Sequence, residues 1–248
     1  MDAEKTDAIV IRLADFSNTS RVVTFFTRDF GKTAAIAKGG KRLKGPFDSG
    51  LDLLSESRVV FLRKSSSALD ILTEASLTSR FRPHPSNVGG FYAACYMADL
   101  LASLTEEDDP HPQLFEAARW SLQQFMQTAD YRLSLLRFEL VLLREIGQLP
   151  AFEECLECGE TTLQPGRYSF WVAQGGMLCP KCQKPEFGLH QVQAGTIALM
   201  RHLSQDSESL AAHLSASPQQ LQEVRHTLTA AFSAILGHRP KTLRYLQF

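Results

Sequence analysis

The sequence contains no long hydrophobic run. A membrane-spanning helix needs about 18 or more consecutive apolar residues, and no segment of the 248 residues approaches that length. The first residues, Met1-Asp2-Ala3-Glu4-Lys5, are acidic, and no long apolar stretch of the kind found in signal peptides follows them. We therefore expect no membrane partner and a cytoplasmic location.

The chain also has no large net charge of either sign. The chain has 26 Lys and Arg residues against 27 Asp and Glu residues, so its total charge predicts no polyanionic partner. The distribution is uneven, because residues 1–80 carry 13 basic and 10 acidic groups, whereas residues 81–150 carry 5 and 9. Residues 151–248 are balanced, with 8 of each. The N-terminal block is therefore the only net-basic part of the chain.

Recognisable catalytic motifs are absent as well. The sequence has no Gly-x-Ser-x-Gly turn, no His-Glu-x-x-His helix and no His-x-Glu pair of a zinc deaminase. Gly31-Lys32-Thr33 resembles the end of a phosphate-binding loop, but Phe26 stands where that loop needs its first glycine. None of the seven histidines stands in metal-ligand spacing. We expect a protein that is not an enzyme.

Cysteine is scarce, yet four of the five cysteines form two Cys-x2-Cys pairs, Cys155/Cys158 and Cys179/Cys182, separated by the 20 residues 159–178. Two such turns can close a tetrahedron of thiolates around Zn²⁺. A redox dithiol and a pair of disulfides are the alternatives, although a redox site usually needs only one such pair beside a βαβ unit. The spacing favours one structural Zn²⁺ per chain, with no open position for catalysis. We expect the remaining cysteine, Cys95, to lie in a helical core.

The first 80 residues have the pattern of a small β-barrel. Apolar residues alternate along residues 9–13, and β-branched and aromatic residues dominate residues 20–27. Further strands are expected at residues 32–38, 51–63 and 69–75. Five short strands without a helical segment favour a closed barrel of the OB type, whose surface binds oligonucleotides in many proteins. A barrel that serves only as a scaffold is the alternative.

A basic loop follows the third expected strand. Residues 38–46 read Lys-Gly-Gly-Lys-Arg-Leu-Lys-Gly-Pro. Its glycines would let the backbone approach a phosphate chain closely, and its cations would neutralise phosphates. Most charged runs, however, are simply solvated surface loops. Composition alone leaves both interpretations open.

The rest of the chain is expected to be helical, apart from the cysteine segment. Helices are predicted from an N-cap at Ser86 to about Leu104, over 114–126, from Asp130 to a stop at Gly147, over 192–203, and from an N-cap at Ser217 to 236. The predicted class is α+β, with an OB-fold at residues 1–80, a helical domain at 81–150 and 190–248, and a zinc ribbon or knuckle at 151–189.

The order of these features is distinctive over residues 9–244. The basic loop precedes a helical block containing Arg-Phe-Glu-Leu at 137–140, then come the two cysteine pairs, with Gly-Gly-Met-Leu-Cys at 175–179, and finally Gly-His-Arg-Pro-Lys-Thr-Leu-Arg at 237–244. In kind and order these segments resemble the RecO family of bacterial recombination mediators. Each motif is weak alone, but their succession across the whole chain is specific.

The resemblance implies an OB-fold, a helical domain with a zinc segment inserted in it, and a non-enzymatic role near the nucleoid. Members of the family bind single- and double-stranded DNA and anneal complementary strands coated by the single-stranded-DNA-binding protein. They work with RecR and thereby help RecA to replace that coat. A zinc-stabilised adaptor that binds only proteins is the alternative function.

The resemblance also implies roles for particular side chains. The basic loop would place four cations on DNA: Lys38, Lys41, Arg42 and Lys44. Strand periodicity puts three more on or near the same barrel: Arg12, Arg21 and Lys32. Three helix arginines could meet the acidic, Phe-ending tail of the single-stranded-DNA-binding protein: Arg132, Arg137 and Arg144. Four phenylalanines could face DNA or fill the barrel core, and the sequence does not assign them: Phe16, Phe25, Phe26 and Phe30.

Overall fold

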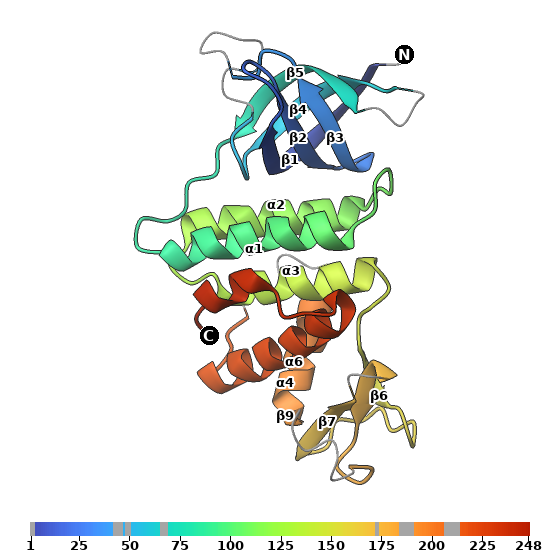
Figure 1. Ribbon diagram of the computed structural model, residues 1–248. Coiled ribbons are helices and arrows are strands. Elements are labelled where there is room, and N and C mark those ends of the chain that lie inside the picture. The colour runs from blue at the N-terminus through green and yellow to red at the C-terminus, as the bar shows by residue number, and fades with distance from the viewer. Residues whose placement is uncertain are drawn as a thin grey trace. The chain divides into compact units, whose positions relative to one another are not determined.

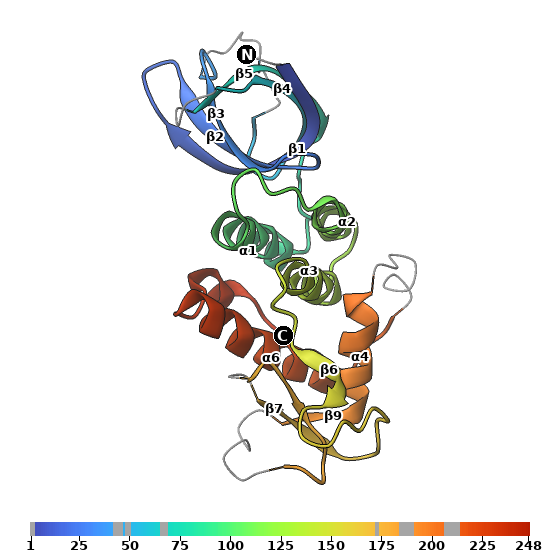
Figure 2. The same cartoon turned by 90° about the vertical axis from the view of Figure 1, so that its right-hand side faces the viewer.

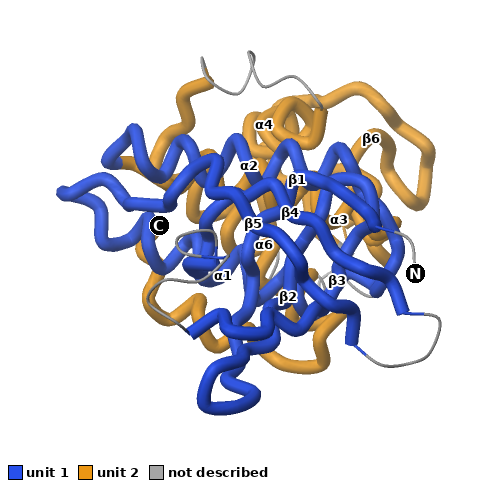
Figure 3. Tube along the Cα trace, turned by 90° about the horizontal axis from the view of Figure 1, so that it is seen from above, with its two compact units in different colours: residues 1–129 blue, residues 130–248 orange. Residues whose placement is uncertain are grey.

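The computed structural model describes residues 3–41, 47, 51–64, 69–171, 174–183, 191–205 and 214–248. The chain forms two compact units, Met1–Ala129 and Asp130–Phe248 (Figure 3). The first unit thus joins two helices to the barrel, whereas the sequence-based division begins the helical domain at residue 81. No helix among these residues has the length and apolar character needed to cross a membrane.

Five strands of the first unit close into a barrel, which Figure 2 shows nearly end-on. Their order around the barrel is β1-β2-β3-β5-β4, and all neighbours are antiparallel except β3 and β5. The parallel pair closes the barrel, as expected for an OB-fold. The predicted five-stranded barrel is confirmed, with strands β1 (Ala3–Asp15), β2 (Arg21–Thr27), β3 (Gly31–Ala37), β4 (Glu56–Leu62) and β5 (Asp70–Ser79).

The barrel core follows from strand alternation. In β3 every second residue is buried, and small Ala35 and Ala37 point inward beside larger Phe25 and Phe61. Successive side chains of a strand point to opposite faces. Phe25 therefore lies in the barrel core, whereas the next residue, Phe26, is buried on the outside.

Two helices, α1 (Val88–Leu104) and α2 (Pro112–Gln127), complete the first unit (Figure 1). The ring of Phe26 packs against Phe115 of α2, with ring centroids 6.4 Å apart. Asn87 caps α1, because its side-chain oxygen accepts a hydrogen bond from the Gly90 backbone N at 2.8 Å. The predicted cap, Ser86, was wrong by one residue.

The second unit holds helices α3 (Arg132–Glu145), α4 (Ala194–Ser204) and α6 (Pro218–Leu236), and a short 3₁₀ helix η3 (Lys241–Tyr245). Helix α6 starts with the predicted Ser217 cap, which forms a full capping box with Gln220. A buried ion pair joins α3 to α6, since the Arg225 guanidinium donates to both carboxylate oxygens of Glu139 at 2.7 and 2.8 Å.

A four-stranded sheet in the order β6-β8-β7-β9 also belongs to the second unit. Its strands are short, yet they bury several apolar side chains: Phe152, Tyr168, Phe170, Met177, Leu178 and Val192. The strands are β6 (Ala151–Cys155), β7 (Arg167–Trp171), β8 (Gly176–Leu178) and β9 (Gln191–Gln193). This sheet carries the cysteine pairs.

Candidate metal centre and nucleic-acid surface

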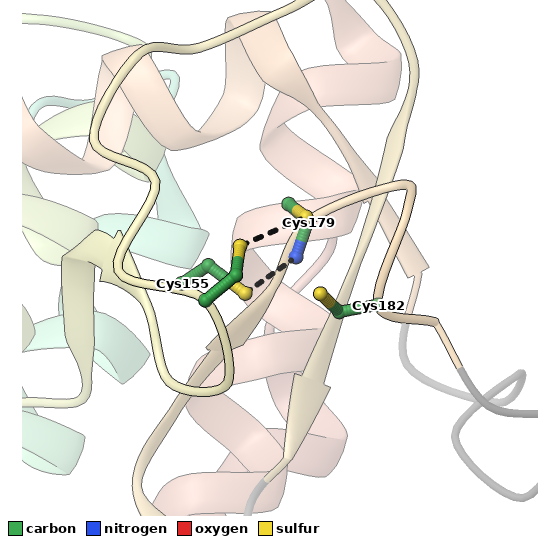
Figure 4. A group of neighbouring side chains, drawn as sticks. Cys155, Cys179 and Cys182 are labelled. Atoms are coloured by element: carbon green, nitrogen blue, oxygen red, sulfur yellow. Dashed lines mark hydrogen bonds between the residues drawn. The ribbon is translucent and has the colours of Figure 1, made fainter.

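The sheet of the second unit brings the two cysteine pairs together. Strand β6 ends at Cys155 and β8 ends just before Cys179, and the two strands pair in parallel with Cys155 opposite Met177. Each strand therefore delivers its Cys-x2-Cys turn to the same edge (Figure 4). The four sulfurs all lie within 4.8 Å of one another.

The sulfur geometry fits a metal ion. Cys158 Sγ and Cys179 Sγ are 3.7 Å apart, and a tetrahedron with Zn–S bonds of about 2.3 Å has edges of about 3.8 Å. A disulfide would require about 2.05 Å, and all four cysteines are free. The four-cysteine group can hold a metal ion. Its four sulfurs would fill a tetrahedral coordination sphere and leave no position for water or substrate.

Backbone hydrogen bonds favour the thiolate form of one of the four cysteines, which is the form that binds a metal ion. Burial acts to raise the pKa of the Cys155 thiol, but backbone N–H donors, led by that of Cys179 at 3.3 Å, outweigh burial and lower the pKa to about 6. Hydrogen bonding to the Cys158 and Cys179 thiols instead raises the pKa of Cys182 to about 12. Several thiolates this close repel one another, and a bound cation would remove that repulsion.

A second cluster lies at the end of the barrel that carries the β1–β2 hairpin. Strand register places Arg21, the first residue of β2, opposite Asp15 and Ala37. Lys38 directly follows β3 and is exposed. The Lys41 backbone N donates to Thr19 O in the hairpin at 3.1 Å, so the start of the basic loop lies against the hairpin.

The structure places the other predicted DNA contacts differently. Arg12 is exposed in β1, opposite Thr24 and farther from the hairpin. Arg42 and Lys44 lie outside the described residues. Lys32 lies near the opposite end of the barrel, because register pairs it with Phe26.

The Lys32 ammonium is already engaged. It donates to the Ala102 carbonyl at 2.9 Å and to the Thr105 carbonyl at the C-terminus of α1. Cations are favoured there because the last carbonyls of a helix have no partners within it. Lys32 would have to break both hydrogen bonds to reach DNA, and we leave it out of the proposed interface.

Comparison with known proteins identifies the family. The sequence-family model described as Recombination protein O N terminal matches residues 1–81. The family model described as Recombination protein O C terminal matches residues 86–244. The chain belongs to the RecO family of DNA repair proteins.

Similar proteins carry the name DNA repair protein RecO. The relative from Rhodopirellula baltica is 36% identical over 202 residues, which cover 81% of this chain and 75% of the relative. Those from Anaeromyxobacter dehalogenans strain 2CP-1 and Bacillus pumilus are 29% and 27% identical. The first alignment covers 99% of this chain and 96% of the relative, and the second covers 98% and 93%. The similarity therefore extends over both units of this RecO-family chain.

The structure also separates the four phenylalanines that the sequence left unassigned. Phe25 and Phe26 are buried, and Phe30 is partly buried with its ring edge-on to Phe61 at 5.7 Å. Phe16 is 63% exposed at the hairpin. The turn-forming run Ser-Asn-Thr-Ser at 17–20 was a signal that could have placed Phe16 at a strand end.

The three helix arginines differ in their availability. Arg137 is buried. The Arg144 guanidinium donates to Ser204 O at 2.6 Å. Arg132 pairs with Asp130 at 2.6 Å, but its side chain is 34% exposed against 26% for Arg144, so it is the most accessible of the three.

Proposed function

We propose that this protein binds single- and double-stranded DNA through the hairpin end of its barrel. It would anneal complementary strands coated by the single-stranded-DNA-binding protein and, with RecR, help RecA to load at gaps and breaks. No covalent step is involved. The chain would act in the cytoplasm, where its DNA substrate lies.

The observation that carries the proposal is the grouping of Arg21, Lys38 and Lys41 at one end of the barrel. Asp15 is the acidic residue paired with two of them. Such a group would neutralise DNA phosphates and release the counterions condensed on them, and this gain does not depend on base sequence. The sequence of residues 39–45 adds Arg42 and Lys44 to the same segment.

This arrangement suits annealing in physical terms. Two DNA strands repel each other through their phosphates, and cations that contact the backbone reduce this repulsion. Contacts to phosphates leave base edges free to pair, because the sequence is read at the bases and not at the backbone. A protein that holds strands in this way can bring them together without selecting their sequence.

We propose Zn²⁺ as the ion of the four-cysteine group, bound by Cys155, Cys158, Cys179 and Cys182. Its role would be to tie together the two Cys-x2-Cys turns that follow β6 and β8, so that binding of the ion stabilises the fold of this sheet. All four positions would be filled by sulfur, so the ion would be structural. The bound ion would stabilise the fold of the second unit and take no part in a reaction.

The partner contacts are proposed from the family. The acidic tail of the single-stranded-DNA-binding protein would meet cations of the second unit, among which Arg132 is the most accessible of the predicted three. Such a charged contact at the rim of an interface would act mainly on the rate of association.

Annealing of complementary strands coated with the single-stranded-DNA-binding protein tests this function. We expect the protein to accelerate annealing, RecR to modulate the rate, and Lys38→Gln/Lys41→Gln to slow it severalfold. An adaptor that binds only proteins would bind RecR or the coating protein and yet leave bare DNA unbound at low salt. That result would overturn the proposed function.

A further inference from the structure

One aromatic side chain at the basic end of the barrel has no place in the core. Phe16 is 63% exposed, more than Tyr245 at 44% and Phe91 at 42%. A phenylalanine ring left in water costs free energy, because its apolar surface is not buried. Single exposed apolar residues are common, so the setting of the ring decides what it means.

The hairpin fixes the exposure of this ring. The Phe16 backbone N donates to Ser20 O at 3.1 Å, and the Ser17 backbone N donates to the same oxygen at 3.1 Å. The Ser20 backbone N in turn donates to Ser17 Oγ at 3.1 Å. These bonds close a short turn between β1 and β2. The backbone at Phe16 is therefore held at the tip, beyond the last pair of the ladder, Asp15 and Arg21.

The surroundings of the ring are polar and cationic. Residues 17–19 are exposed Ser, Asn and Thr. Lys41 contacts the hairpin through its backbone, and Arg21 starts the strand that leaves it. A protein partner that buried this ring would need other large apolar groups beside it, whereas the turn residues 17–19 next to it are polar. A nucleotide combines a flat apolar face with a negative phosphate, which matches an aromatic ring beside cations.

We infer that the Phe16 ring stacks on a base of single-stranded DNA while the neighbouring cations contact its phosphates. The inference rests on the proposed DNA binding and adds to it a preference for unpaired strands. The bases of a duplex are already stacked on one another, so the ring would contribute to single-strand binding and little to duplex binding.

The test compares Phe16→Ala with Phe16→Trp and with a matched control, Phe91→Ala, which removes an exposed ring from α1. Each is titrated with an oligo-thymidine strand, an abasic strand and a duplex, all of equal length. Base stacking on an aromatic residue predicts that Phe16→Ala weakens oligo-thymidine binding roughly 5- to 100-fold. The Phe16→Ala variant should bind the abasic strand and the duplex with the affinity of the native protein. The salt dependence of its DNA binding should also be unchanged.

Phe16→Trp should restore oligo-thymidine binding, and its fluorescence should be quenched by that strand beyond the change seen with the two native tryptophans. Phe91→Ala should change nothing. Equal losses on all three nucleic acids, or no loss on any, would overturn the inference, as would a loss of RecR binding with unchanged DNA affinity. If the native protein binds no DNA at low salt, the proposed function itself fails. If it binds with a steep salt dependence but Phe16→Ala is silent, only the stacking role fails.

Discussion

The Lys41 ammonium lies 2.9 Å from Asp15 Oδ2, at the end of the barrel where the basic loop begins. The Arg21 guanidinium approaches the other oxygen of the same carboxylate at 4.0 Å. Asp15 is largely exposed, so this ion pairing contributes little to stability. Its electrostatic effect on a phosphate is larger, because the carboxylate both occupies two cations and repels the ligand.

Asp15→Asn should therefore tighten single-stranded DNA binding. A unit charge at about 4 Å in water is worth about 1 kcal/mol, which corresponds to roughly fivefold in affinity at low salt. Fluorescence anisotropy with a labelled oligonucleotide measures the change. The matched control is Asp7→Asn, which breaks the 2.9 Å pair with Arg58 nearer the other end of β1. Equal effects of the two substitutions would argue against a localised DNA surface.

Lys32→Met should lower stability and leave DNA affinity nearly unchanged. The substitution keeps the apolar stem of the side chain but removes the charged hydrogen bonds to the Ala102 and Thr105 carbonyls. Hydrogen bonds from charged groups contribute about 1.5–3 kcal/mol, so we expect a loss of about 2 kcal/mol in the free energy of unfolding. Urea denaturation and a DNA titration of the same preparation measure both quantities. A large loss of affinity in a fully folded variant would restore Lys32 to the interface.

Cys158→Ser should reduce bound zinc from about one ion per chain to a small fraction, because the tetrahedron loses a sulfur. Metal analysis of the purified protein measures this. Cys95→Ser is the control, since Cys95 lies in α1 of the other unit. The zinc-depleted variant should be cleaved faster by protease within residues 151–183 while keeping most of its DNA affinity. Native protein that is fully folded yet free of metal would contradict the zinc assignment.

The parts of this structure that depend on local spacing could be predicted from the sequence. The two Cys-x2-Cys pairs predicted the sulfur cluster, and alternation in β1 to β3 predicted the barrel. Ser217 and Pro218 marked the start of α6 correctly, because capping depends on adjacent residues.

Features set by contacts between distant segments could not be predicted. Strand periodicity gives the face on which Lys32 lies, but not its meeting with carbonyls some 70 residues later in α1. The same limit applies to Arg137, whose helical position suggested a surface and whose side chain is buried. Asp15 was overlooked because its importance arises from its distance to Lys41, a property of the folded hairpin.

The salt dependence of single-stranded DNA affinity tests the central claim most directly. Removing one cation that neutralises a phosphate should reduce the magnitude of the slope of log affinity against log salt by about 0.7. Lys38→Gln/Lys41→Gln should therefore reduce the slope by about 1.4. Lys5→Gln/Lys64→Gln, which removes the same charge from near the other end of the barrel, should leave it unchanged. Equal reductions in the two double variants, or none in the first, would contradict DNA binding at the hairpin end.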